Sequence, residues 1–244
     1  MRTASALVAA LVVCALLAGA ASGAGSARPR VTLFGDSVAA AIAYQATARK
    51  TLARGLDLQI DAKVCRRLAE TGCPYKGDRP QSVLSLVTQP AKPLGSVVVI
   101  DVGYNDPPAE YGDDVDRVMQ ALVRQGVTTV IWVTMQEKRP LYRATNAAIR
   151  AAAKRWPQIQ IADWNDASST KPKWFVDDGL HLSSAGAVGL AKFLRPLLLA
   201  WTCTGQCQRR IAGDVGFQRN RNVDDLSRHG VVPALKVDEN RPPP

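Results

Sequence analysis

Two short motifs of this 244-residue chain carry the side chains that an activated-serine reaction needs. Gly35-Asp36-Ser37 follows a β-branched run, and Asp178 precedes His181 by three residues. A serine hydroxyl is a poor nucleophile until a base takes its proton, and histidine is the usual base. The only other histidine, His229, lies in a C-terminal stretch without a core-forming pattern, so His181 is the one candidate base in the domain. A tight turn at the first motif and a capping turn with a solvated histidine at the second are the structural alternatives.

A third motif, Gly103-Tyr104-Asn105-Asp106, closes the most continuous apolar run of the chain, GSVVVIDVG. The Asn105 amide can donate a hydrogen bond to the oxyanion of a tetrahedral intermediate. Glycine and asparagine also favour a left-handed turn, which is the structural alternative here. We assign Asp36 and Asp106 to hydrogen bonding within their loops. Because all three motifs follow strand-like segments or precede a helix, chance explains the set poorly.

The elements that must position these residues alternate between strand and helix along the chain. Continuous β-branched runs predict buried strands, and apolar residues at helical spacing predict helices. We expect strands at Val31–Phe34, Leu56–Val64, 95–103, 127–135 and Ile159–Ile161, and helices at Ala39–Ala53, Arg79–Thr88, Asp113–Arg124, Leu141–Trp156 and Ser183–Trp201. The last helix has Ser183 or Ser184 available as its N-cap.

This alternation predicts βαβ units, whose right-handed crossovers give a parallel sheet covered by helices on both faces. We therefore expect a three-layer α/β/α domain from about Arg28 to Trp201. In such sheets the working site lies at the carboxyl ends of the strands, where the three motifs fall.

The motifs FGDS, GYND and DGLH, in this order from Phe34 to His181, resemble those of the SGNH (GDSL-type) hydrolases. The resemblance covers about Val31 to Leu199. It implies a flavodoxin-like sheet of five parallel strands and an esterase or lipase-like activity. It also implies that Ser37 is the nucleophile, that Asp178 and His181 complete a triad, and that the Ser37 backbone N–H and the Asn105 side chain form part of the oxyanion hole.

One stretch departs from the family pattern, which places a second oxyanion-hole glycine just after the second strand. Cys65 and Arg66 stand at that place, and Gly72 lies slightly further on as an alternative. We expect the backbone N–H of Arg66 to serve as the third donor. We also expect the charges of Arg66 and Arg67 to favour an anionic or sugar-rich alcohol portion, the alternative being two solvated arginines.

Both ends of the chain lie outside this domain. Residues 1–24 read as a secretory signal peptide, with cleavage after Ala20 or Ala24, because the apolar stretch is short for a membrane span. A retained anchor is the alternative. We expect the hydrolase domain to occupy 28–207 and residues 208–244 to form a disordered tail, with a partner-binding segment as the alternative.

Four cysteines remain after the leader, an even number that in an exported chain favours disulfides over metal ligands. Cys65–Cys73 and Cys203–Cys207 close the shortest loops and are the expected pairs, although three pairings are formally possible. The net charge of +10 is spread along the chain without a nucleic-acid motif, so we expect no nucleic-acid partner. A basic surface can instead be drawn to anionic cell-wall polymers, lipids or acidic polysaccharide, or can serve solubility alone.

We expect a secreted serine esterase that removes short, acetyl-like groups from a polysaccharide or cell-wall glycan. The sparse aromatics and the lack of an apolar lid sequence argue against a deep acyl tunnel. An O-acyltransferase with the same triad and a non-catalytic glycan-binding or cell-wall module are the alternatives. We expect no cofactor, no metal, since no two histidines are placed to share an ion, and no membrane insertion after cleavage of the leader. The sequence leaves the oligomeric state open.

Overall fold

The computed structural model describes residues 28–202. The expected signal peptide (1–24), tail (208–244) and Cys203–Cys207 pair lie outside the described residues. Within 28–202, none of the helices combines the length and the apolar character needed to cross a membrane.

The centre of the fold is a sheet of five strands, all parallel, in the order β2-β1-β3-β4-β5. Leu33 of the first strand pairs with Ile60 on one side and Val99 on the other. β3 and β4 are buried along their whole length, which suits β-branched strands covered on both faces. The strands are β1 (Arg30–Gly35), β2 (Asp57–Ala62), β3 (Val97–Asp101), β4 (Thr129–Val133) and β5 (Ile159–Ala162). The predicted parallel sheet is confirmed.

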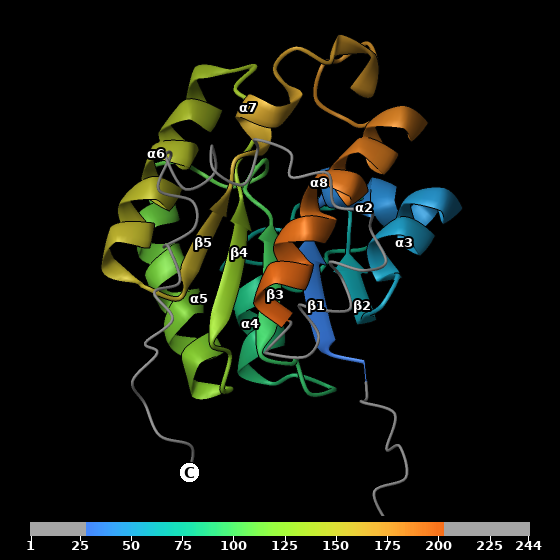
Figure 1. The fold of residues 1–244 in the computed structure, drawn as a ribbon. Helices are drawn as coiled ribbons and strands as arrows, with labels where there is room; N and C mark the ends of the chain where they lie inside the picture. Colours follow the sequence, from blue (N-terminus) through green and yellow to red (C-terminus); the bar gives the residue numbers. More distant parts are fainter. Residues whose placement is uncertain (1–27, 203–244) are drawn as a thin grey trace, which may run out of the picture.

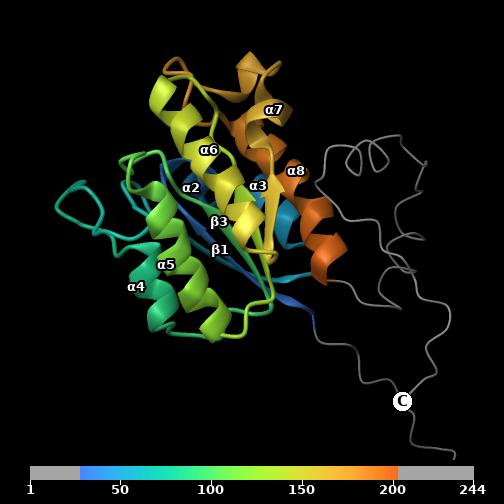
Figure 2. The same cartoon turned by 90° about the vertical axis from the view of Figure 1, so that its left-hand side faces the viewer.

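Helices cover both faces of this sheet, so the predicted three-layer arrangement is also confirmed (Figures 1 and 2). One layer holds α2 (Ser37–Tyr44), α3 (Ala46–Ala53) and α8 (Ser184–Thr202), and the other holds α4 (Val83–Thr88), α5 (Tyr111–Arg124) and α6 (Pro140–Arg155). Successive side chains of a strand point to opposite faces. Accordingly, Val97 and Val99 join the core under the first layer, whereas Val98 and Ile100 join the core under the second.

The helix expected at Ala39–Ala53 is in fact two helices, α2 and α3, separated by Gln45. The backbone of Gln45 is extended, with φ −93° and ψ 108°. Its N–H donates to the carbonyl of Ala41 and ends α2, while its side-chain oxygen accepts from the N–H of Thr47 and caps α3. The spacing of apolar residues does not reveal a glutamine that ends one helix and caps the next. A prediction from that spacing therefore gives one helix in place of two.

Two short elements after β5 were not expected: α7 (Trp164–Ser168) and the 3-10 helix η1 (Pro172–Trp174). The rings of Trp164 and Trp174 stack with centroids 5.3 Å apart. Trp174 also lies directly on α8, where a Cβ at Gly186 would be 1.9 Å from the Trp174 carbonyl oxygen. Only glycine allows this close approach, which fixes the segment that leads to His181 against α8.

Candidate active site

Ser37 is the first residue of α2 and follows β1 with a single residue between them, Asp36. Asp36 is fully buried and caps the helix, because its carboxylate accepts from the N–H of Val38 at 3.0 Å. Its second oxygen accepts from the N–H groups of Gly103 and Tyr104 at 3.3 and 3.2 Å. Burial raises the pKa of Asp36 to about 6, and these hydrogen bonds act in the opposite direction. Asp36 therefore ties the Ser37 turn to the loop that carries Asn105, as its expected role in loop hydrogen bonding requires.

The structure brings Ser37, His181 and Asp178 into one hydrogen-bonded line. Nε2 of His181 lies 3.0 Å from Oγ of Ser37, and Nδ1 lies 2.6 Å from Oδ2 of Asp178. The hydrogen bond from His181 and the backbone N–H of Leu180 lower the pKa of Asp178 to about 2. Asp178 thus remains a carboxylate that holds the imidazole proton on Nδ1 and leaves Nε2 free to accept from the serine.

The turn from Asp178 to His181 is itself held by the aspartate. Oδ1 of Asp178 accepts from the N–H groups of Leu180 and His181 at 2.8 and 2.9 Å, and Gly179 has the positive φ of 66° that the turn requires. The N–H of Val176 donates to the carbonyl of His181 at 2.9 Å. The capping turn that the sequence offered as an alternative is therefore present together with the histidine contact.

Asn105 lies on the loop after β3 and is half-buried. Its Nδ2 donates to the backbone carbonyl of Arg66 at 3.2 Å, so one amide hydrogen is held by the loop after β2 and the other remains for a further acceptor. The neighbouring Asp106 accepts from the N–H of Leu68 at 2.8 Å, and burial raises its pKa to about 7. Asp106 thus joins the same two loops, as expected for a structural carboxylate.

The two expectations for Arg66 are wrong. Its backbone N–H donates to the carbonyl of Lys63 at 3.2 Å, which closes a turn and removes it as an oxyanion donor. Its guanidinium is buried and bonds the Asp61 carboxylate at 2.8 Å and the Gln81 carbonyl at 3.1 Å, with further contacts to the carbonyls of Asp61 and Gly35. The charge of Arg66 is therefore neutralised inside the protein and does not face a substrate.

Cys65 and Cys73 form the expected disulfide. Cys65 has a φ of 66°, a left-handed conformation that favours glycine, at the place where the family pattern has glycine. The alternative donor Gly72 is engaged, because its N–H donates to the carbonyl of Pro80 at 2.9 Å. The loop lies beside the nucleophile strand, since the N–H of Lys63 donates to the Gly35 carbonyl at 3.0 Å.

Lys138 is a residue of this region that sequence reasoning missed. It lies on the loop after β4, and a Cβ placed on Gly179 would be 3.0 Å from its Cε and 3.7 Å from its Nζ. The exposed ammonium therefore borders the turn between Asp178 and His181. Its place in the loop that follows β4 is the signal that could have found it, because the loops at the carboxyl ends of parallel strands form the site.

No family model matches the chain, but part of it is similar in sequence to curated proteins. The O-acetyltransferase OatA of Staphylococcus aureus is 29% identical over 162 residues, which cover 66% of this chain and 24% of that protein. The peptidoglycan O-acetyltransferase OatA of Listeria monocytogenes is 29% identical over 103 residues, 42% of this chain and 16% of that protein. The chain thus spans a quarter or less of the length of these curated relatives.

Several solved structures share this architecture, and two of the three described here are esterases by name. TesA superposes with a TM-score of 0.53 at 19% identity, covering 69% of this chain and 97% of TesA. The psychrotrophic esterase EstA from Pseudoalteromonas sp. gives 0.52 at 13% identity, covering 71% and 98%. A carbohydrate acetylesterase family member from Sinorhizobium meliloti gives 0.52 at 12% identity, covering 70% and 98%. These likenesses and the five-stranded parallel sheet show that the chain has the fold of the SGNH hydrolases.

Proposed function

We propose that this chain is a serine esterase that removes short, acetyl-like groups from a polysaccharide or cell-wall glycan. The observation that carries the proposal is the line from Oγ of Ser37 through the His181 ring to Asp178, with separations of 3.0 and 2.6 Å. A serine with only a structural role at the start of a helix does not require a histidine beside its hydroxyl, nor a carboxylate that fixes the tautomer of that histidine. This arrangement is what general-base activation of a hydroxyl requires.

The proposed reaction has two halves. His181 takes the Ser37 proton as Oγ attacks the ester carbonyl, and the resulting oxyanion is held by the Ser37 N–H and the free amide hydrogen of Asn105. His181 then returns the proton to the departing alcohol, which leaves an acyl-enzyme. In the second half His181 deprotonates a water molecule, which attacks the acyl-enzyme and releases the acid and free Ser37.

An O-acyltransferase is the second candidate, and a specific finding favours it. The matched curated relatives are O-acetyltransferases by name, and one of them is named for peptidoglycan. The first half of the reaction is the same for both candidates. A sugar hydroxyl then replaces water as the group that His181 activates, and the acetyl group moves to the glycan instead of to water.

The openness of the site supports a polymeric substrate with a small acyl group. The side chains of His181 and Asp178 are 45% and 47% exposed, so the reacting groups stand at the surface and not at the bottom of a tunnel. A long chain can pass over such a site, whereas a fatty acyl group gains little apolar burial there. The Cys65–Cys73 disulfide supports the proposed location outside the cytoplasm, where disulfides persist.

A chain-length series tests the acyl preference. We expect kcat/KM for p-nitrophenyl esters to be highest for acetate and to fall about tenfold or more beyond butyrate, because the exposed site cannot bury added methylenes. The same assay with an added glycan oligosaccharide separates the two candidates. Faster p-nitrophenol release with acetate appearing on the glycan identifies a transferase, and unchanged release with free acetate identifies an esterase. Highest activity on long-chain esters would contradict the short-acyl assignment.

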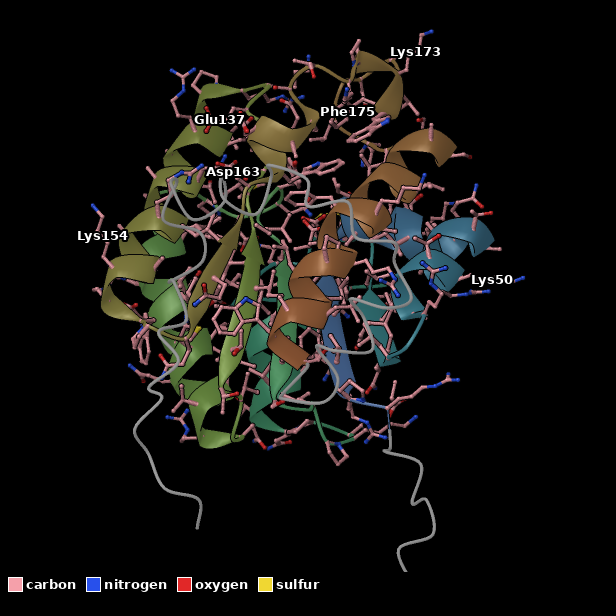
Figure 3. The ribbon with its side chains drawn as sticks, viewed as in Figure 1. Lys50, Glu137, Lys154, Asp163, Lys173 and Phe175 are labelled. Atoms are coloured by element: carbon pink, nitrogen blue, oxygen red, sulfur yellow. A yellow bond between two sulfur atoms is a disulfide. The ribbon has the colours of Figure 1, made fainter. Side chains whose placement is uncertain are left out.

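Lys138 is the cation that we propose to face an anionic alcohol portion in place of Arg66. We expect Lys138→Met to raise KM about threefold for 4-acetoxybenzoate and to leave phenyl acetate unchanged, the modest size being typical of an exposed charge pair. Lys138→Arg should restore the wild-type ratio. Lys154→Met, on the outer side of α6, is the matched control (Figure 3). Equal effects of Lys138→Met on both esters would remove this role.

A further inference from the structure

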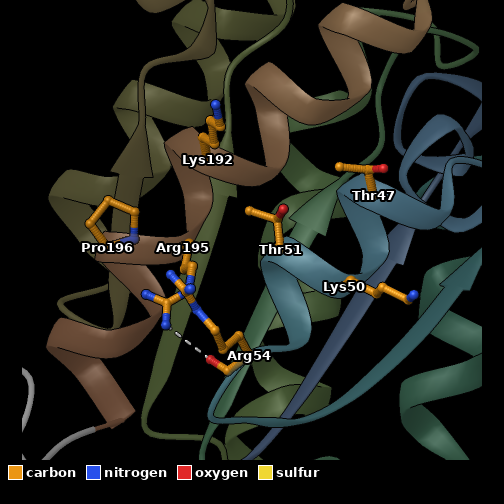
Figure 4. Close-up of a pocket in the computed structure, with 7 residues that line it drawn as sticks. All are labelled: Thr47, Lys50, Thr51, Arg54, Lys192, Arg195 and Pro196. Carbon is orange, nitrogen blue, oxygen red and sulfur yellow. Dashed lines mark hydrogen bonds between the residues drawn. The ribbon is translucent and has the colours of Figure 1, made fainter. Parts of the chain in front are cut away.

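A concave site lies between α3 and α8 (Figure 4), and its lining includes none of Ser37, Asp178 and His181. Its volume is about 600 Å³. The side chains that line it are two threonines, two lysines, two arginines and a proline: Thr47, Lys50, Thr51, Arg54, Lys192, Arg195 and Pro196. We call this site the α3–α8 groove. Each lining side chain except that of Pro196 ends in a hydroxyl, ammonium or guanidinium group, and none carries a carboxylate.

The charge on this layer differs from that on the opposite layer. Neither α3 nor α8 contains an acidic residue, so their basic side chains have no partner within their own helices. On the opposite layer, by contrast, Arg117 pairs with Asp114 at 3.0 Å and Arg155 pairs with Asp116 at 2.8 Å. Among residues 28–202, none of the four cations of the groove forms an ion pair. Like charges gathered without counter-charges are unfavourable until an anion binds.

Arg195 gives the groove an unfilled hydrogen-bonding group. One terminal nitrogen of its guanidinium donates to the backbone carbonyl of Arg54 at 3.2 Å, which fixes the side chain across the two helices (Figure 4). Its Nε is buried and has no partner within the part of the chain that the structure describes. Burial and the nearby charge of Arg54 lower the pKa of Arg195. The carbonyl of Arg54 takes only one of the five N–H donors of this guanidinium within the described residues, so terminal N–H groups remain for an oxyanion in the groove.

The lining also narrows the class of anion. Single-stranded nucleic acids bind where aromatic side chains stack on bases, and none of the lining residues is aromatic. A surface that enters a membrane would need large exposed apolar side chains, and none of the residues that line the groove is aromatic or a large aliphatic residue. Each side of the groove carries one arginine and one lysine, and the α3 side adds two threonine hydroxyls, which suits a chain that carries an oxyanion on successive units.

We propose that the α3–α8 groove binds a polysaccharide chain that carries carboxylate groups. Binding there is independent of the serine chemistry and does not rest on the proposed function. It gives the protein a binding site for an acidic glycan that uses none of Ser37, Asp178 and His181. The helix layer that forms the groove is also connected to the catalytic residues. In this layer α2 starts at Ser37, and α8 starts three residues after His181.

The test measures binding and needs no turnover. Fluorescently labelled hexagalacturonate is titrated with the full chain, and its methyl ester is the neutral match. We expect the acid to bind and the ester to bind at least tenfold more weakly, with the affinity for the acid falling as salt is raised. Failure of the acid to bind, equal affinity for the ester, or equal affinity for a single-stranded DNA hexamer would each overturn the proposal.

Two double variants with the same net charge distinguish binding at the α3–α8 groove from nonspecific attraction by the net charge of the protein. Lys50→Gln/Lys192→Gln removes one exposed cation from each wall, and Arg124→Gln/Lys154→Gln removes two exposed cations from α5 and α6. Lys50 and Lys154 lie on opposite sides of the molecule (Figure 3). We expect about fivefold weaker binding for the groove variant and less than twofold for the control, as two exposed charge contacts would give. Equal losses in both variants would assign the binding to net charge and overturn the site.

Discussion

We expect Ser37→Ala and His181→Ala each to lower kcat for p-nitrophenyl acetate by about 10⁴-fold or more, because removing either nucleophile or base disables the whole unit. Both side chains stand at the surface of the site, so their truncation should leave the fold intact. The melting temperature of each variant should therefore stay close to that of the wild type. Hydrolysis measured beside circular dichroism checks both parts of the result.

Asp178→Asn provides a graded comparison within the same experiment. Asparagine keeps an oxygen to accept from the N–H groups of Leu180 and His181, but its amide nitrogen then faces Nδ1 of His181, where it favours the wrong tautomer and cannot stabilise an imidazolium ion. Because the Asp178 side chain is 47% exposed, water can screen part of the missing charge. We expect a loss of kcat of up to about 10⁴-fold, no larger than for Ser37→Ala or His181→Ala.

A fluorophosphonate probe supplies the outcome that would contradict the nucleophile assignment. The probe should attach to Ser37 in the wild type, as mapped by mass spectrometry, and should not label the Ser37→Ala variant. Normal turnover by folded Ser37→Ala would end the serine-esterase proposal. Absence of labelling and turnover in the wild type would favour the non-catalytic glycan-binding alternative.

The parts of the fold that sequence reasoning found are those where local pattern and burial agree. β3 and β4 were predicted because uninterrupted β-branched runs are buried on both faces of a parallel sheet. Ser37 and Asn105 follow strands and His181 precedes the last helix, and this pattern predicted that the three residues lie at one edge of the sheet. The split at Gln45 was missed because side-chain capping, not apolar spacing, ends a helix there.

The errors at the site have a different cause, which is the dependence of charge on tertiary contacts. An arginine next to an expected oxyanion hole suggests a substrate contact, yet Arg66 is 2% exposed and satisfied by Asp61 and backbone carbonyls. Nothing within the sequence around Arg66 reveals those partners. Lys138 was missed for the converse reason, since its neighbour Gly179 is 41 residues away in the chain and is brought close only by the fold.

The oxyanion hole gives the second large expected effect. We expect Asn105→Ala to lower kcat for p-nitrophenyl acetate by about 100- to 1000-fold with little change in KM, because the amide meets full negative charge only in the transition state. The carbonyl of Arg66, 3.2 Å from Nδ2, already holds the amide in place, so little reorganisation accompanies the reaction. Steady-state kinetics on the variant separate the two parameters.

Asn105→Asp is the sharper companion to this change. It keeps the size of the side chain but replaces both amide hydrogens with an acceptor, which faces the Arg66 carbonyl and repels an oxyanion. We expect its kcat to be at least as low as that of Asn105→Ala, while fluorophosphonate labelling of Ser37 slows in both variants. A rise in KM with unchanged kcat in both would instead make Asn105 a ground-state binding residue. In that case the donors that stabilise the oxyanion would have to come from backbone N–H groups, with that of Ser37 the first to examine.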